Sequence, residues 1–304
     1  MPNHLYTINL KISYSFLIFV HLIIKSNIMG LSSNILWHQT TADGLRGILK
    51  EKGFFYSYSL ETISSTEIVV KAAFPMVSVC DFPLCEIGDY LKRYGGYSIG
   101  LTRDWGVKNG LSPVWYCEAT SSVLKMQLSR FKEVSKSYIV NNNARDDFNR
   151  FIHLFSYIKN YEGVLPNRGY KIYRFYDERE FRIVPTIDLL RKKSIKPFYT
   201  STDYQQYKDE NKSSMIRSLK LPFEWEDIRF IIVDNNKNID EMRSIIEKMS
   251  GKKDLRINYF TNDQIKEDVI GTNHNLVVSE ASLSIKETLK NRNQLKPKSG
   301  KKIT

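Results

Sequence analysis

The segment from residue 176 to residue 185 (YDEREFRIVP) most constrains the fold, because its polar and apolar residues alternate as they do in a strand. Successive side chains on a strand point to opposite faces of the sheet. Glu178, Glu180 and Arg182 therefore share one face. Phe181 and Ile183 share the other, which is predicted to enter the core. The expected result is a row of two carboxylates and one guanidinium on the opposite surface.

Such a row has two interpretations, and the sequence leaves both open. Neighbouring carboxylates can raise one another's pKa, and an adjacent arginine can hold one of them ionised, which suits a catalytic site. The simpler alternative is a solvated ion network across neighbouring strands, with no chemical role.

Length and composition indicate a folded protein with a sizeable core. The chain has 304 residues, 42% of them hydrophobic, and its 18 Tyr and 16 Phe argue against disorder. Its three cysteines, Cys80, Cys85 and Cys117, have no metal-ligand spacing and cannot all pair, which favours a reduced, cytoplasmic setting. HExxH, CxxC, P-loop and GxGxxG motifs do not occur, so the sequence predicts no metal site.

The positive charge lies mostly near the two ends of the chain. The net charge is +12, but residues 286–304 hold seven Lys or Arg against one Glu, and residues 1–28 hold two Lys and no acidic residue. A basic tail is usually a solvated extension and only sometimes an anchor for nucleic acid or an acidic partner. We therefore predict three regions: an N-terminal extension over 1–28, an α+β domain over 29–283 and a basic disordered tail over 284–304.

The first 28 residues contain an apolar run, ISYSFLIFVHLII, over residues 12–24. It is too short to cross a bilayer as a helix. A signal-peptide core is conceivable, but a small-residue cleavage site does not follow it. The alternative hypothesis is that Met29 is the true start, in which case no membrane association is expected.

Short strands and helices alternate along the rest of the chain, which predicts a single α+β domain. Thr40 or Thr41 is the expected cap of a first helix that Gly53 ends. Residues 200–220 are polar and are predicted to form an exposed loop. Extended segments are expected over 35–38, 54–60, 74–80, 97–101, 114–117, 179–184, 229–233 and 255–260, and further helices over 87–94, 121–157 (two, broken near 141–143), 239–249 and 261–270.

Four segments in order resemble the AbiGi family. They are residues 36–49 (LWHQTTADGLRGIL), 74–84 (FPMVSVCDFPL), 94–106 (YGGYSIGLTRDWG) and 177–182 (DEREFR). The resemblance runs from about Ile35 to Val233, with Gln39 and Phe181 as departures where an aromatic residue and a Trp are expected. It implies the antitoxin component of an abortive-infection, phage-resistance pair. The implied partner is a nucleotidyltransferase-like toxin protein.

The same layout more distantly resembles the ADP-ribosyltransferase-like fold, in which an early strand bears His, a middle strand Tyr or Ser, and a late strand Glu. That resemblance implies NAD as cofactor, His38 against its ribose, Tyr97 under the nicotinamide and Glu180 as the catalytic carboxylate. Glu178 and Arg182 are the adjoining candidates for ligand binding. A glutamate bonded to the 2′-hydroxyl would stabilise the oxocarbenium-like centre that forms as nicotinamide leaves.

Three function classes therefore remain open. The first is an antitoxin that acts by binding its toxin. The second is an NAD-dependent ADP-ribosyltransferase or NAD-hydrolysing enzyme of phage defence that uses His38 and Glu180, although His38 is equally well explained as a structural residue bonded to backbone. The third is a nucleic-acid binder that uses the basic tail.

Overall fold

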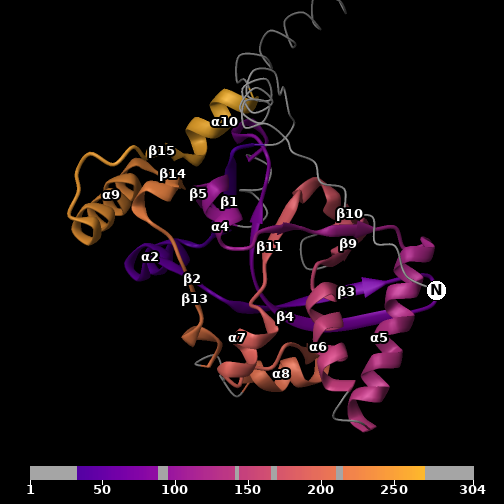
Figure 1. Cartoon of the computed structure of the whole chain (residues 1–304). Helices are drawn as coiled ribbons and strands as arrows, with labels where there is room; N and C mark the ends of the chain where they lie inside the picture. Colours follow the sequence, from indigo (N-terminus) through magenta and orange to yellow (C-terminus); the bar gives the residue numbers. More distant parts are fainter. Residues whose placement is uncertain (1–32, 88–94, 141–143, 166–169, 210–214, 271–304) are drawn as a thin grey trace, which may run out of the picture.

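The structure, a computed structural model, describes residues 33–87, 95–140, 144–165, 170–209 and 215–270 (Figure 1). Three predicted segments fall outside these residues: the N-terminal extension, residues 88–94 of a predicted helix, and the basic tail. The structure therefore does not test the hypotheses about them. Within the described part of the chain, helices and strands alternate in an α+β arrangement, as predicted. None of the helices there is long and apolar enough to span a membrane.

The strands are β1 Ile35–Thr40, β2 Gly53–Phe55, β3 Ser57–Ser64, β4 Val69–Cys80, β5 Tyr97–Thr102, β6 Ser112–Pro113, β7 Trp115–Cys117, β8 Ile158–Asn160, β9 Glu162–Leu165, β10 Tyr170–Arg174, β11 Glu180–Ile183, β12 Tyr199–Thr200, β13 Lys220–Pro222, β14 Ile228–Val233 and β15 Asn258–Thr261. The α-helices are α2 Ala42–Glu51, α4 Arg103–Lys108, α5 Ser122–Val140, α6 Ala144–Phe155, α7 Ile187–Lys192, α8 Ser201–Asp209, α9 Asn236–Ser250 and α10 Asn262–Ile270. Short 3-10 turns are η1 Leu84–Glu86, η3 Phe175–Glu178, η5 Ile216–Ser218 and η6 Trp225–Asp227.

The main sheet has the order β15-β14-β5-β1-β4-β11-β6, and β3 and β12 also pair with β4. Its pairs are antiparallel except β14 with β15. The long strand β4 joins two regions. Its first part, Val69–Met76, pairs with β3, whereas Val77–Cys80 pairs with β11. β4 is therefore the element that positions the candidate site.

Helices cover both regions of the sheet. α2 and α9 pack on β5 and β14, where Leu45 and Met242 are fully buried. α5 and α6 pack against the first part of β4 and bury Leu128 and Phe155. Figure 1 shows α2 and α9 at one end of the molecule and α5 and α6 at the other. Trp37 of β1 belongs to a smaller third cluster on the opposite face of the sheet from α2.

Local sequence signals explain the first two helices. The Thr41 hydroxyl accepts the Gly44 N–H at 3.1 Å and caps α2, and Thr102 caps α4 in the same way through the Trp105 N–H. α2 ends at Glu51, and the left-handed residue that caps it is Lys52, with a φ of 50°, and not the predicted Gly53, which begins β2. Thr41 is therefore the cap, one of the two predicted residues.

Two predictions about elements were wrong. Residues 201–209 form α8 and not a loop, because Tyr204 and Tyr207 pack against the core from an otherwise polar helix. β11 begins only at Glu180: Glu178 lies in η3, and Arg179 has a left-handed φ of 43° that separates the two. The other predicted elements that fall within the described residues occur with shifted ends, α5 and α6 among them.

Candidate functional site

β11 lies between β4 and β6, and its register places Glu180 opposite Cys80 and Arg182 opposite Ser78. Glu180 and Arg182 share one face, and Phe181 and Ile183 pack into the core on the other, as the alternation predicted. The prediction that Glu180 and Arg182 lie on a solvated surface was wrong. Glu180 is 5% exposed and Arg182 is fully buried, because β3, β8 and the residues after α6 cover this face as well.

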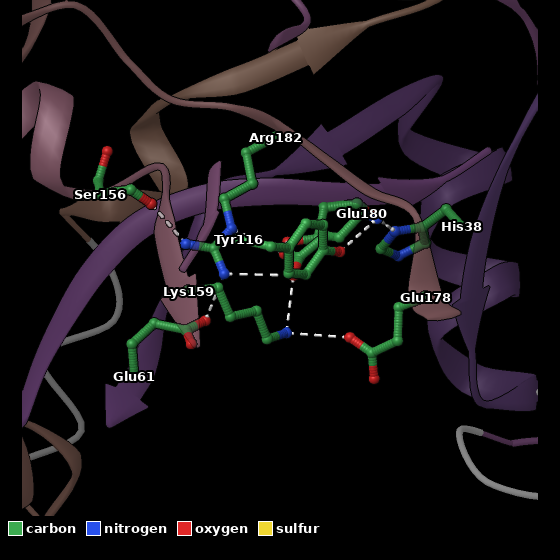
Figure 2. Close-up of polar contacts among 9 residues, drawn as sticks. His38, Glu61, Tyr116, Ser156, Lys159, Glu178, Glu180 and Arg182 are labelled. Atoms are coloured by element: carbon green, nitrogen blue, oxygen red, sulfur yellow. Dashed lines mark hydrogen bonds and ion pairs between the residues drawn. The ribbon is translucent and has the colours of Figure 1, made fainter. Parts of the chain in front are cut away.

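The Glu180 carboxylate accepts four hydrogen bonds from the chain's own side chains (Figure 2). Its Oε1 accepts from the Ser78 hydroxyl at 2.9 Å and from Arg182 Nε at 2.8 Å. Its Oε2 accepts from Lys159 Nζ at 2.7 Å and from Arg182 Nη2 at 3.2 Å. The Glu180 N–H donates to the Tyr116 hydroxyl at 2.8 Å. Both carboxylate oxygens are thus held on two sides.

Two cations connect Glu180 to further carboxylates. Arg182 Nη2 donates to Glu61 of β3 at 2.8 Å, and its Nη1 donates to the Ser156 carbonyl at 2.5 Å. Lys159 of β8 donates to Glu178 at 2.9 Å. The buried cluster of Glu61, Glu178, Glu180, Lys159 and Arg182 therefore contains three carboxylates and two cations, and β3, η3, β8 and β11 contribute to it.

Electrostatics keep Glu180 and Lys159 charged despite their burial. Burial alone would raise the pKa of the Glu180 carboxyl, but Arg182 and Lys159 outweigh burial and hold that pKa well below its usual range. Burial would lower the pKa of Lys159, yet Glu180, Glu61 and Glu178 raise it well above the ordinary value. Glu180 is therefore an ionised acceptor, which excludes a general-acid role near neutral pH.

His38 lies where β1 and β4 separate. The two strands share the register pair Trp37 with Cys80, and beyond it the His38 ring bonds the Ser78 carbonyl through Nδ1 at 2.9 Å. Because a carbonyl only accepts, Nδ1 carries the proton. Burial lowers the pKa of His38, so the ring is neutral and its Nε2 is an acceptor. The ring also packs edge-on against Phe54, 4.9 Å away between centroids.

Ser78 connects the two candidate residues, since its carbonyl accepts from His38 and its hydroxyl donates to Glu180. His38 and Ser78 also line a cavity of about 740 Å³ between α2, β2, β3 and α8. Gly47 of α2 faces this cavity, and a Cβ there would meet no atom within 4 Å. Glu180 is not among the lining residues. His38 and Ser78 therefore border the cavity directly, whereas the Glu180 carboxylate lies behind Ser78 and is connected to the cavity wall by the Ser78 hydroxyl.

Tyr97 lies apart from this group. It is buried on β5 beneath α9, and its hydroxyl accepts from the Asn238 amide at 2.5 Å. The structure thus brings together Glu178, Glu180 and Arg182, and links His38 to them through Ser78.

Four contributors to the site were not predicted from the sequence: Glu61, Ser78, Tyr116 and Lys159. Ser78 lies within the family-like segment 74–84, but its hydroxyl contact depends on the pairing of β4 with β11. Lys159 lies on a three-residue strand that gives no periodic signal of its own. Metal-binding clusters of His, Cys, Asp or Glu do not occur among the residues that the structure describes.

The fold and this buried site belong to a chain of the abortive phage-resistance class. A family described as "Putative abortive phage resistance protein AbiGi, antitoxin" matches residues 47–234, which is more than half of the chain. The protein belongs to the AbiGi family, as its sequence motifs predicted. A relative from Lactococcus lactis subsp. cremoris, "Abortive phage resistance protein AbiGi", is 29% identical over 227 residues, which cover 64% of this chain and 88% of the relative.

One solved structure is similar at a much lower level. It is "Thermus sp. 2.9 DarT in complex with carba-NAD+", with a TM-score of 0.30 and 12% identity over 76% of this chain and 97% of that chain. A likeness of this size carries no argument about activity or ligand.

Proposed function

We propose that this chain is the antitoxin component of an abortive-infection pair and acts by binding its toxin partner, a nucleotidyltransferase-like protein. The family description supports the antitoxin role. The observation that carries the proposal is the saturation of Glu180. Each of its carboxylate oxygens already accepts two hydrogen bonds, so no acceptor position remains for a substrate hydroxyl.

The buried cluster has a structural task under this proposal. It ties β3, β8, η3 and β11 together through charged hydrogen bonds, and it thereby holds the surface of this region in one arrangement. Rigid surfaces bind partners at a lower entropic cost. Binding, unlike catalysis, needs no accessible carboxylate.

Bacterial growth and co-purification test the proposal together. We expect the full chain to be harmless when expressed alone, to restore growth when co-expressed with its toxin, and to co-elute with the toxin at micromolar concentration. Glu180→Gln, which keeps the shape of the side chain, is compared with Glu67→Gln, which removes an exposed ion pair with Lys125. Growth arrest by the chain alone that Glu180→Gln abolishes and Glu67→Gln preserves would overturn the antitoxin role.

A second function, NAD binding and turnover, is favoured by one specific observation. The neutral His38 ring borders the 740 Å³ cavity, and its Nδ1–H donates to the Ser78 carbonyl. Its Nε2 is therefore left as an acceptor for a ribose hydroxyl. Saturation-transfer NMR with NAD is the direct test, with His38→Ala beside the exposed control Lys248→Met. The enzyme hypothesis requires NAD contact that His38→Ala removes, and no contact at millimolar NAD contradicts it.

A further inference from the structure

Four tyrosines from three elements form one aromatic surface, here named the tyrosine wall: Tyr58, Tyr199, Tyr204 and Tyr207. Their ring centroids lie 4.7 Å apart for Tyr58 and Tyr199, 5.2 Å for Tyr58 and Tyr207, and 4.9 Å for Tyr199 and Tyr207. Tyr204 stacks on Tyr207 with an angle of 17° between the ring planes. Centroid separations this short leave no space for a ligand between the rings, so a ligand can only lie on the wall.

Hydrogen bonds fix the wall to the rest of the fold. The Tyr58 hydroxyl donates to the Lys196 carbonyl at 2.5 Å, which holds the turn after α7 in place. The Tyr204 hydroxyl donates to the Tyr58 carbonyl at 2.9 Å, which holds α8 against β3. The wall is therefore ordered before any ligand arrives, which lowers the entropic cost of binding.

The wall lines a cavity of about 560 Å³. Tyr58, Tyr199 and Tyr207 contribute aromatic surface to it, and Lys196 and Asp203 contribute charges. Tyr58, Tyr207 and Ile216 also line the 740 Å³ cavity that begins at His38, so the two cavities adjoin at the wall. A volume of this size is typical of sites for small organic ligands.

Two cations stand beside the aromatic surface. Lys196 Nζ lies 5.1 Å from the centroid of the Tyr199 ring. Arg217 lines the adjoining cavity, where it opposes the burial-driven rise in the pKa of Tyr207. Both side chains are exposed, and neither forms an ion pair with any residue that the structure describes. They are positioned to bind an anion next to an aromatic ring.

We propose that the tyrosine wall and its two cations form a nucleotide-binding site. The base would stack on Tyr199 and Tyr207, because every nucleobase has a π face that aromatic side chains bind. The phosphate would lie against Lys196 and Arg217, and a base amino group can donate to Asp203. The site is separate from Glu180 and does not rest on either proposed function.

Tyrosines in contact more often belong to ordinary core packing than to a binding site. The exposure of the rings and the groups around them distinguish the two. Tyr58 is 7% exposed and fits that explanation. Tyr199 and Tyr207 are only partly buried, and they face a cavity lined by Lys196, beside the cavity that Arg217 lines. Core packing explains the contacts among the rings but explains neither the cavity nor the cations.

The site is tested by titrating the full chain with adenosine monophosphate. Calorimetry measures the affinity, and saturation-transfer NMR shows which ligand protons contact the protein. We expect sub-millimolar binding with transfer to the base protons. Tyr207→Leu should weaken binding about fivefold or more through lost stacking, whereas Tyr207→Phe should retain it. Lys196→Met and Arg217→Met alter exposed side chains and should each weaken binding of the nucleotide, whereas the exposed control Lys248→Met should not.

Three outcomes overturn the proposal: no saturation up to millimolar nucleotide, equal affinity in Tyr207→Phe and Tyr207→Leu, or competition by inorganic phosphate that is as strong as that by the nucleotide. Circular dichroism checks that Tyr207→Leu is folded, and the two cation variants decide the question if it is not. Toxin neutralisation is scored separately, so failure of the antitoxin role and failure of this site are distinguishable.

Discussion

Replacement of Arg182 by Met tests whether the buried cluster is a single electrostatic unit. The substitution keeps an unbranched side chain in the buried position but removes four hydrogen bonds, two to Glu180, one to Glu61 and one to the Ser156 carbonyl. Removal of one partner of a buried ion pair costs about 3–5 kcal/mol, because the remaining charge is left unpaired. We expect a loss of this size in the free energy of unfolding at pH 7.

The matched control is Arg191→Met. Arg191 also faces two carboxylates, those of Asp146 and Asp188, but its side chain is 56% exposed. Exposed ion pairs contribute at most about 1 kcal/mol each, so this variant should lose little stability. Urea unfolding followed by circular dichroism measures both. Equal, small losses in the two variants would refute the argument that the cluster is excluded from solvent.

The double variant Glu180→Gln/Arg182→Met separates lost attraction from stranded charge. If most of the cost comes from an unpaired Glu180 carboxylate, its neutralisation should restore part of the stability that Arg182→Met loses. A double variant that is less stable than Arg182→Met alone would show instead that Glu180 is adequately held by Lys159 and Ser78.

Further predictions concern acid stability, packing and thiol reactivity. Because the folded pKa of Glu180 is depressed, its contribution to stability is present above the ordinary carboxyl pKa of 4.5 and is lost as pH falls below that value. Glu180→Gln should therefore make stability depend less on pH in acid unfolding monitored by fluorescence. The folded pKa of His38 is also lowered, so stability is full above 6.5 and falls as pH decreases through that value; His38→Gln should lessen this loss, and an unchanged pH profile would contradict it. Gly100→Ala should cost about 1–3 kcal/mol, because its Cβ would lie 2.9 Å from the Trp37 ring, and a neutral change in thermal melting would show that the ring relaxes. Burial raises the pKa of the Cys80 thiol, so iodoacetamide should label Cys80 much more slowly in native than in urea-unfolded protein, as mass spectrometry of its peptide can measure.

Periodicity and capping signals in the sequence were enough to locate most elements of the sheet and its covering helices. β1, β5 and β14 are short apolar segments whose type needs no long-range information, and Thr41 and Thr102 cap helices through contacts three residues away. The family motifs were likewise local strings of residues. These features were predictable because each depends on near neighbours in the chain.

The candidate site depended on contacts that no local pattern contains. Alternation correctly placed Glu180 and Arg182 on one face, but it could not show that β3 and β8 cover that face and turn an expected surface row into a buried cluster. α8 was missed for the same reason, since its stability comes from Tyr204 and Tyr207 packing on the distant strand β3.

The sequence by itself therefore determined most of the strands and helices, though not α8 or the start of β11, and the family to which the chain belongs. Only the tertiary structure decided that Lys159 and Glu61 meet Glu180, that Ser78 links Glu180 to His38, and that tyrosines from three elements share one cavity. The physical reason is that strand pairing and burial act between residues far apart in the chain, and burial sets whether a charged side chain is solvated or locked in place.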